Sequence, residues 1–114
     1  MIKDNVSYES ISRAAKRLRN HIVKTPLLKS QYVNQKLKTN LFLKAENLQT
    51  IGAFKFRGAM NTILQLPASV SKVVAWSSGN HAQAVAAAAK ITGREATIVM
   101  PEDSPQTKLD GTAF

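Results

Sequence analysis

The chain has 114 residues, which is enough for one modest hydrophobic core and too short for two. Sixteen basic and seven acidic residues give a net charge of +9, and 44% of the residues are hydrophobic, as expected for a folded globular protein. The basic residues are dispersed, without a run of five or an aromatic platform, so we do not expect nucleic acid as a partner. The absence of cysteine excludes disulfides, thiolate metal sites and cysteine nucleophiles.

No stretch approaches the roughly 18 apolar residues that cross a bilayer, and the first residues lack the apolar centre of a signal peptide. We therefore expect a cytoplasmic protein with no membrane partner. His81 has no second histidine or paired carboxylate at ligand spacing, so we expect no metal site.

Helical spacing marks the first segment of the chain. Ser7 is a suitable N-cap for a helix whose apolar residues recur at three- and four-residue intervals over 11–22. Pro26 then biases the backbone away from helix, and the polar segment 30–38 is a candidate second helix. The apolar run 40–46 predicts a strand.

The next segment places a lysine at a helix start. Residues 47–52 predict a loop, and apolar residues at helical spacing predict a helix over 56–66 that ends at Pro67. Lys55 then lies at or just before this N-terminus, with a phenylalanine on each side and small residues beyond. We expect this apolar setting to shield the amine from water, as Schiff-base lysines require. The alternative is an exposed lysine on an ordinary first turn.

The second half predicts a strand–helix–strand unit. In order, we expect a hinge over 68–71, a strand over 73–76, a turn over 77–79, an alanine-rich helix over 80–91 and a strand over 96–100. Such a unit predicts an α/β fold in which the two strands are parallel. We expect the tail, 105–114, to form only turns.

A polar turn follows the first strand of this unit. Ser77, Ser78, Gly79 and Asn80 occupy the carboxyl end of the strand, where ligands bind in open α/β sheets. Their hydroxyls, close backbone and carboxamide suit a carboxylate or a phenolate oxygen. The alternative is that Ser77 or Ser78 merely caps the following helix. A catalytic triad from Ser78 and His81 is disfavoured, because both lie on one turn of chain.

Three motifs carry a family resemblance. In this order, they are Lys44-Ala-Glu-Asn-Leu-Gln49, Gly52-Ala-Phe-Lys-Phe-Arg-Gly-Ala59 and Ser77-Ser-Gly-Asn-His-Ala-Gln83. Together they resemble the serine/threonine dehydratase and serine racemase family of fold-type II pyridoxal-phosphate enzymes, over about 11–108. The resemblance implies an incomplete tryptophan-synthase-beta-like architecture. Residues 1–67 would be the N-terminal segment of the large cofactor domain, 68–71 a hinge, and 72–114 the first part of the small parallel-sheet domain.

The resemblance also implies residue roles. Lys55 resembles the lysine that holds pyridoxal phosphate and moves the α-proton of the substrate, and Phe54 the residue packed against the cofactor ring. Asn80 resembles the hydrogen-bond partner of the ring hydroxyl oxygen. Ser78 matches the second acid/base of the racemases. The loop that binds the substrate carboxylate corresponds to Ser77, Ser78, Gly79 and His81.

The implied activity is elimination of water and ammonia from L-threonine or L-serine to give a 2-keto acid, in a homo-oligomeric parent. The alternatives are a serine racemase, or a non-catalytic fragment that acts only through association. The family's phosphate-binding glycine loop and ring-nitrogen partner follow the position at which this chain ends, and the tail from Leu109 departs from the family pattern. We therefore expect a truncated N-terminal fragment that is inactive alone and binds the cofactor weakly.

Overall fold

The computed structural model describes residues 6–113. Helix α1 (Tyr8–Leu18) begins after Ser7, as predicted, with a reciprocal capping box. The Ser7 hydroxyl accepts a hydrogen bond from Ser10 N, and the Ser10 hydroxyl accepts one from Ser7 N. The box satisfies two backbone donors that a helix start leaves unpaired. At the other end of α1, Leu18 is buried in the core.

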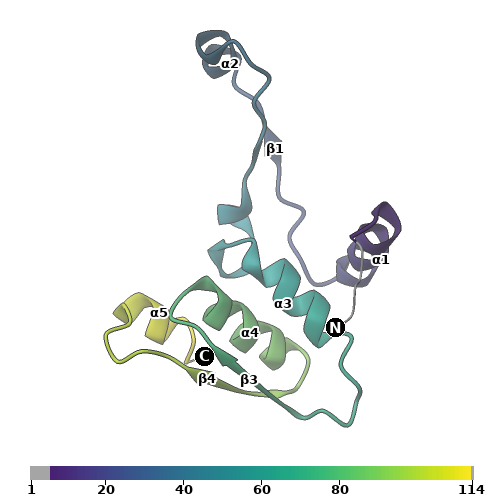
Figure 1. The fold of residues 1–114 in the computed structure, drawn as a ribbon, viewed down its shortest axis with the longest axis vertical. Coiled ribbons are helices and arrows are strands. Elements are labelled where there is room, and N and C mark those ends of the chain that lie inside the picture. The colour runs from purple at the N-terminus through teal and green to yellow at the C-terminus, as the bar shows by residue number, and fades with distance from the viewer. Residues whose placement is uncertain (1–5, 114) are drawn as a thin grey trace.

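Residues 24–45 form an extension that projects away from the rest of the molecule (Figure 1). It contains strand β1 (Leu27–Leu28), helix α2 (Gln31–Leu37) and strand β2 (Leu43–Lys44). The strands pair antiparallel, with Leu27 opposite Lys44 and Leu28 opposite Leu43. The helix agrees with the predicted segment 30–38. The strand predicted over 40–46 is only two residues long, because β1 offers two residues for pairing.

Two short 3₁₀ helices, η1 (Glu46–Leu48) and η2 (Thr50–Gly52), occupy the predicted loop and lead into helix α3 (Lys55–Ile63). Helix α3 begins one residue before the predicted start and ends three residues before the predicted end. Past the end of α3, hydrogen bonds that span three residues replace those that span four, and Leu66 N donates to Ile63 O at 3.2 Å. Hydrogen bonds to the third preceding residue are common where an α-helix ends.

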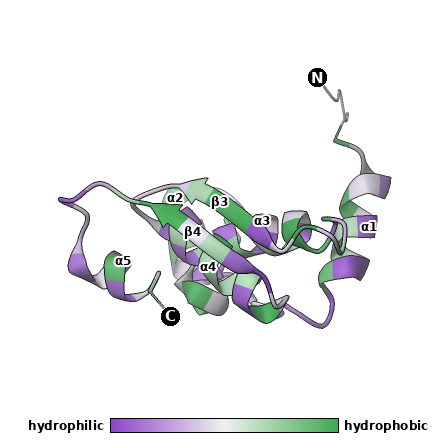
Figure 2. Ribbon diagram, turned by 90° about the horizontal axis from the view of Figure 1, so that it is seen from below, coloured by the Kyte–Doolittle hydropathy of each residue, from purple (hydrophilic) through white to green (hydrophobic). Residues whose placement is uncertain are grey.

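The predicted strand–helix–strand unit is confirmed. It consists of strand β3 (Lys72–Trp76), helix α4 (Asn80–Ile91) and strand β4 (Glu95–Val99). The strands are parallel, in register from Lys72 opposite Glu95 to Trp76 opposite Val99. Hydrophobic residues run along both strands, and α4 lies next to them (Figure 2).

The core lies between α3 and α4, which run side by side (Figure 1). Phe56 and Met60 of α3 are the largest fully buried side chains. They share one cluster with Ala84 and Ala88 of α4, which are fully buried. Alanines on this face of α4 leave room for the large side chains of α3, so the alanine-rich sequence reflects close helix packing.

The tail was predicted to form turns only, and this is wrong. Residues Gln106–Asp110 form a short helix, α5, which starts after Pro105 and is followed by Gly111. Proline is frequent at the start of a helix, and glycine is frequent just past its end. The pattern was therefore present in the sequence.

Candidate active site

Lys55 is the first residue of α3. Its Nζ lies 5.5 Å from the centroid of the Phe54 ring, and both side chains are exposed. The expectation that apolar neighbours shield Lys55 from water is therefore wrong for the described residues: Phe54 is itself 59% exposed and covers one side only. No hydrogen bond or ion pair engages this amine within residues 6–113. The helix dipole opposes a positive charge at this position, so the lysine is not there to stabilise α3.

A strained turn immediately precedes this lysine. Ile51 has φ 65° and Gly52 has φ 70°, both in the left-handed region. That conformation is uncommon for any side chain and unfavourable for a β-branched one. Backbone strain of this kind persists only where neighbouring contacts impose it, and it is frequent at functional sites.

The buried side chain of Gln49 supplies such contacts. Its Oε1 accepts hydrogen bonds from Val23 N at 2.9 Å and Thr50 N at 3.0 Å, and its Nε2 donates to Val23 O at 2.9 Å. Gly52 N donates to Gln49 O at 2.7 Å. The segment that delivers Lys55 is therefore fixed to the chain around Val23.

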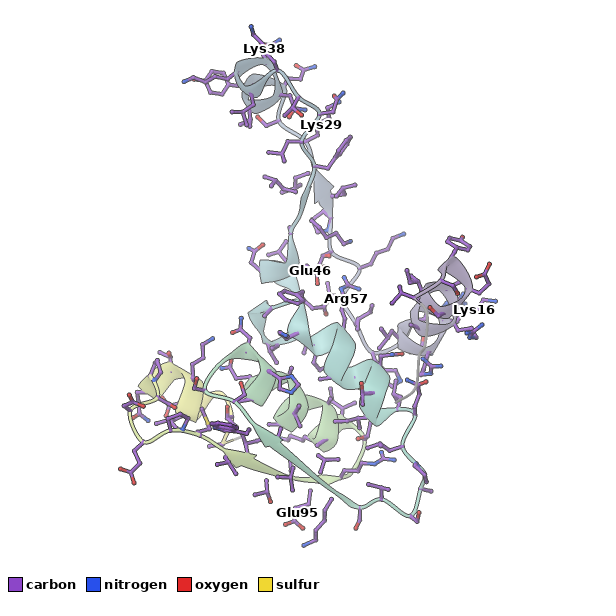
Figure 3. The ribbon with its side chains drawn as sticks, in the orientation of Figure 1. Lys16, Lys29, Lys38, Glu46, Arg57 and Glu95 are labelled. Atoms are coloured by element: carbon purple, nitrogen blue, oxygen red, sulfur yellow. The ribbon has the colours of Figure 1, made fainter. Side chains whose placement is uncertain are left out.

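An ion pair lies at the first turn of α3. Arg57 Nη2 is 2.7 Å from Glu46 Oε1, and its Nε donates to Glu46 Oε2 at 2.7 Å. The Thr25 hydroxyl also donates to Glu46. The hydrogen bonds from Arg57, more than that from Thr25, hold the pKa of Glu46 at about 2, against an ordinary value of 4.5. In Figure 3 these two side chains meet at the base of the extension.

The polar turn connects β3 to α4. Ser77 Oγ accepts a hydrogen bond from Gly79 N at 3.2 Å, and Ser77 N donates to Val99 O at 3.1 Å. Gly79 is the N-cap of α4, and among the residues that the structure describes no side chain caps the helix there. The alternative in which Ser77 or Ser78 serves as the cap is therefore wrong. Ser78 and Asn80 are both exposed.

The two helix starts lie at the same end of the α3–α4 pair (Figure 1). One start carries Lys55 and the other carries the turn before Asn80. His81, one residue further along α4, lines a cavity of about 260 Å³ between α3, β3 and α4, together with Gly58 and Val74. Lys55 does not line this cavity.

Sequence reasoning missed one residue at the turn, Lys108 of α5. Its Nζ donates to Asn80 Oδ1 at 2.7 Å and to Gln83 Oε1 at 3.3 Å. The tail was not predicted to be helical, so nothing placed this lysine beside α4. The proline and glycine around α5 could have predicted the helix, although not its contact with α4.

The side chains at this end of the helix pair fit parts of pyridoxal phosphate. A primary amine suits an aldehyde, an exposed aromatic face suits a planar ring, and a carboxamide suits a ring hydroxyl oxygen. These are, respectively, Lys55, Phe54 and Asn80. By their chemistry, these described side chains suit the ring and aldehyde portions of the group.

The family model described as pyridoxal-phosphate dependent enzyme matches residues 18–114, and the chain belongs to this family. It is 46% identical over 109 residues to an L-threo-3-hydroxyaspartate ammonia-lyase of Saccharomyces cerevisiae and 48% identical over 110 residues to a catabolic L-threonine dehydratase of Staphylococcus aureus. Each alignment covers 94% of this chain, but only 33% and 32% of the respective relatives. The chain therefore spans about a third of the length of these curated relatives.

The fold is similar to that of solved members of the same group. Maize serine racemase matches with a TM-score of 0.89 at 39% identity, covering 95% of this chain and 33% of that chain. The predicted fold class is confirmed: the chain has the α/β, fold-type II arrangement with a parallel strand pair, in incomplete form. The division at 68–71 into two domains stays a prediction.

Proposed function

We propose that this chain is the N-terminal part of an enzyme that removes water and ammonia from L-threonine or L-serine to give a 2-keto acid. The single observation behind the proposal is the arrangement of the two helix starts, which brings Lys55 and the Ser77–Asn80 turn to the same end of one helix pair (Figure 1). Similarity to an L-threo-3-hydroxyaspartate ammonia-lyase and to a catabolic L-threonine dehydratase supports this reaction class.

In this proposal each side chain has a distinct task. Lys55 holds the cofactor through its Nζ and then takes the α-proton of the substrate at the same atom. Phe54 packs against the cofactor ring, and Asn80 hydrogen-bonds the ring hydroxyl oxygen. When bound, pyridoxal phosphate spreads the negative charge that forms on the substrate α-carbon. The substrate carboxylate binds to the turn, through Ser77, Ser78, Gly79 and His81.

The turn is suited to a carboxylate for a physical reason. The first N–H groups of α4 have no partner inside the helix, and no side chain within 6–113 caps them. A carboxylate at this position would satisfy these donors and lie at the positive end of the helix dipole.

A serine racemase is the second candidate, and the exposed hydroxyl of Ser78 favours it. Racemisation needs a second proton donor on the face opposite Lys55, and a serine at a helix start can deliver one. The structural similarity to maize serine racemase agrees with this alternative.

A third candidate is a fragment that acts only by association. Large apolar side chains are exposed on the extension and on the sheet, among them Leu28, Phe42 and Trp76. For the chain alone, we propose that catalysis is absent and cofactor binding weak, and that the full-length parent is a homo-oligomer.

The test combines trapping with a chimera. Pyridoxal phosphate is added to the chain, reduced with borohydride, and the modified lysines are mapped by mass spectrometry. We expect Lys55 to be labelled in preference to the other lysines. Exposed Lys36, far out on α2, serves as the matched control. Preferential labelling of any other lysine would overturn the assignment of Lys55.

In the chimera, this chain replaces the matching third of the Staphylococcus aureus dehydratase. We expect keto acid production from threonine or serine, and its loss in Lys55→Ala. Racemisation without keto acid production would favour the second candidate. A well-folded chimera with neither activity would favour the third.

A further inference from the structure

The contact between Lys108 and Asn80 is unusual for its position. Lys108 lies against the N-terminus of α4, where a helix favours negative rather than positive charge. The contact therefore weakens, rather than adds to, the electrostatic stability of α4. A side chain that breaks a local rule of this kind calls for a compensating role.

Helix α5 is held in place so that Lys108 reaches the turn. Gln83 Nε2 donates to Thr107 O at 3.5 Å, and Gln83 Oε1 accepts from Lys108 Nζ at 3.3 Å. A side chain at Gly111 would overlap the Gln83 carboxamide, so glycine permits the close approach of α5 to α4. Three features thus fix α5 against the first turns of α4.

The hydrogen bond determines which way the Asn80 carboxamide points. An ammonium group has donors only, so the atom of Asn80 that lies 2.7 Å from Lys108 Nζ must be its oxygen. The other end of the carboxamide, Nδ2, is then presented as a donor. A donor is what an anionic or hydroxyl oxygen of a ligand needs, and the adjacent positive charge polarises the amide and strengthens it as a donor.

We propose that Lys108 is a positioning residue that fixes the Asn80 carboxamide with Nδ2 turned toward the ligand. The inference rests on the proposed function, because the ligand that Asn80 would contact is the cofactor ring oxygen. Without Lys108, the carboxamide rotates freely, and its oxygen faces the ligand oxygen for part of the time. Lys108 itself touches neither substrate nor cofactor in this scheme.

The test reads the Asn80 side chain directly in the 114-residue chain. In a ¹⁵N-labelled sample, the two Nδ2 protons of Asn80 are assigned by their loss in Asn80→Asp. In Lys108→Met, we expect these resonances to shift and their base-catalysed exchange with water to slow at least about threefold, because the adjacent positive charge that polarises the amide is lost. Lys108→Arg, which retains charged donors, should restore the wild-type signals. Lys36→Met on α2 is the matched control and should leave them unchanged.

A purely structural role for Lys108 gives a different result. If Lys108 only attaches α5, the backbone amides of 106–110 lose their helical shifts in Lys108→Met. The positioning role instead predicts that these backbone shifts are retained while the Asn80 signals change. Asn80 resonances in Lys108→Met that match those of wild type and Lys36→Met would overturn the proposal.

Borohydride trapping separates this proposal from the proposed function. Preferential labelling of Lys55 in the wild type, with unchanged Asn80 signals in Lys108→Met, refutes the positioning role and leaves the enzyme assignment standing. Altered Asn80 signals without preferential labelling of Lys55 support the positioning role and count against the enzyme assignment.

Discussion

The pair formed by Glu46 and Arg57 connects segments that the sequence keeps apart. Arg57 belongs to the helix that begins with Lys55, Glu46 opens η1, and Thr25 contributes its hydroxyl from the far side of the extension. The Glu46 side chain is 17% exposed and that of Arg57 is 29% exposed, so water screens this pair less than a surface pair. The orientation of α3, and with it the position of Lys55, depends on this contact.

The lowered pKa of Glu46 predicts how stability depends on pH. A carboxyl whose pKa falls from 4.5 to about 2 on folding stabilises the fold above pH 4.5, and loses that contribution as the pH falls to about 2. With screening by water, the contribution at neutral pH is on the order of 1–2 kcal/mol. We expect Glu46→Gln to lower the free energy of unfolding at pH 7 and to flatten its decline between pH 4.5 and 2.

Urea titrations across this pH range measure both effects. Glu95→Gln is the matched control, because Glu95 pairs with Lys72 on the surface, with 61% and 70% of the two side chains exposed. It should leave the pH profile nearly unchanged. A Glu46→Gln profile parallel to that of wild type would contradict the stabilising role of the pair.

Two glycines near Lys55 predict opposite effects of the same substitution. Gly52 has φ 70°, which an alanine tolerates poorly, so Gly52→Ala should destabilise the chain by about 1 kcal/mol. Gly58 lies inside α3, and a methyl group there meets nothing within 4 Å. Gly58→Ala should therefore stabilise the chain by roughly 0.5–1 kcal/mol. Thermal unfolding of both variants checks the signs, and two shifts in the same direction would refute the explanation.

At the scale of elements, Arg94 organises the connection between α3 and β3. Its Nε donates to Val70 O at 3.0 Å, and its Nη2 donates to Leu66 O at 3.2 Å and Pro67 O at 3.5 Å. One guanidinium group thus satisfies carbonyl groups just before the predicted hinge, 68–71, and one within it. A planar fork with five donors can do this, whereas a lysine cannot.

Replacing Arg94 should release this connection. In Arg94→Met, we expect amide hydrogen exchange to rise selectively over 66–71, with a loss of about 1–2 kcal/mol in stability. In Arg94→Lys, hydrogen exchange and stability should lie between those of wild type and Arg94→Met, because lysine keeps the charge but lacks the planar guanidinium group. Arg13→Met, on the exposed part of α1, is the control and should leave exchange in this segment unchanged. Uniformly increased exchange over the whole chain would mean that Arg94 supports global stability only.

Local patterns predicted the elements that local rules determine. The Ser7 cap and the strand–helix–strand unit follow from capping residues and apolar spacing, and the helix over 30–38 follows from a polar segment after Pro26. Each is present. The short strand β2 and the exposure of Lys55 did not follow, because pairing length and burial depend on residues distant in sequence. The contact of Lys108 with Asn80 joins positions 28 apart, and no local pattern encodes such a distance.

At the scale of the whole molecule, residues 6–113 cover the β3–β4 sheet on one face only. Val73, Ala75 and Ile98 pack against the core, whereas Val74, Trp76 and Val99 point outward and are 73%, 79% and 53% exposed. Parallel sheets in folded proteins are usually covered on both faces. The polar pair of Lys72 and Glu95 occupies only the opposite end of the outer face. The apolar end is therefore a surface that favours association.

We expect the isolated chain to self-associate through this outer face as its concentration rises. Trp76 is the only tryptophan, so its fluorescence reports on the face directly: emission should be that of hydrated indole in dilute samples and shift to shorter wavelength on association. Val99→Lys places a charge beside Trp76 and should weaken association by roughly tenfold or more, because a buried unpaired charge is costly. Tyr32→Lys, on exposed α2, is the control. Sedimentation measures the self-association of each variant. Association that weakens equally in both variants would place the contact on the extension rather than on the sheet.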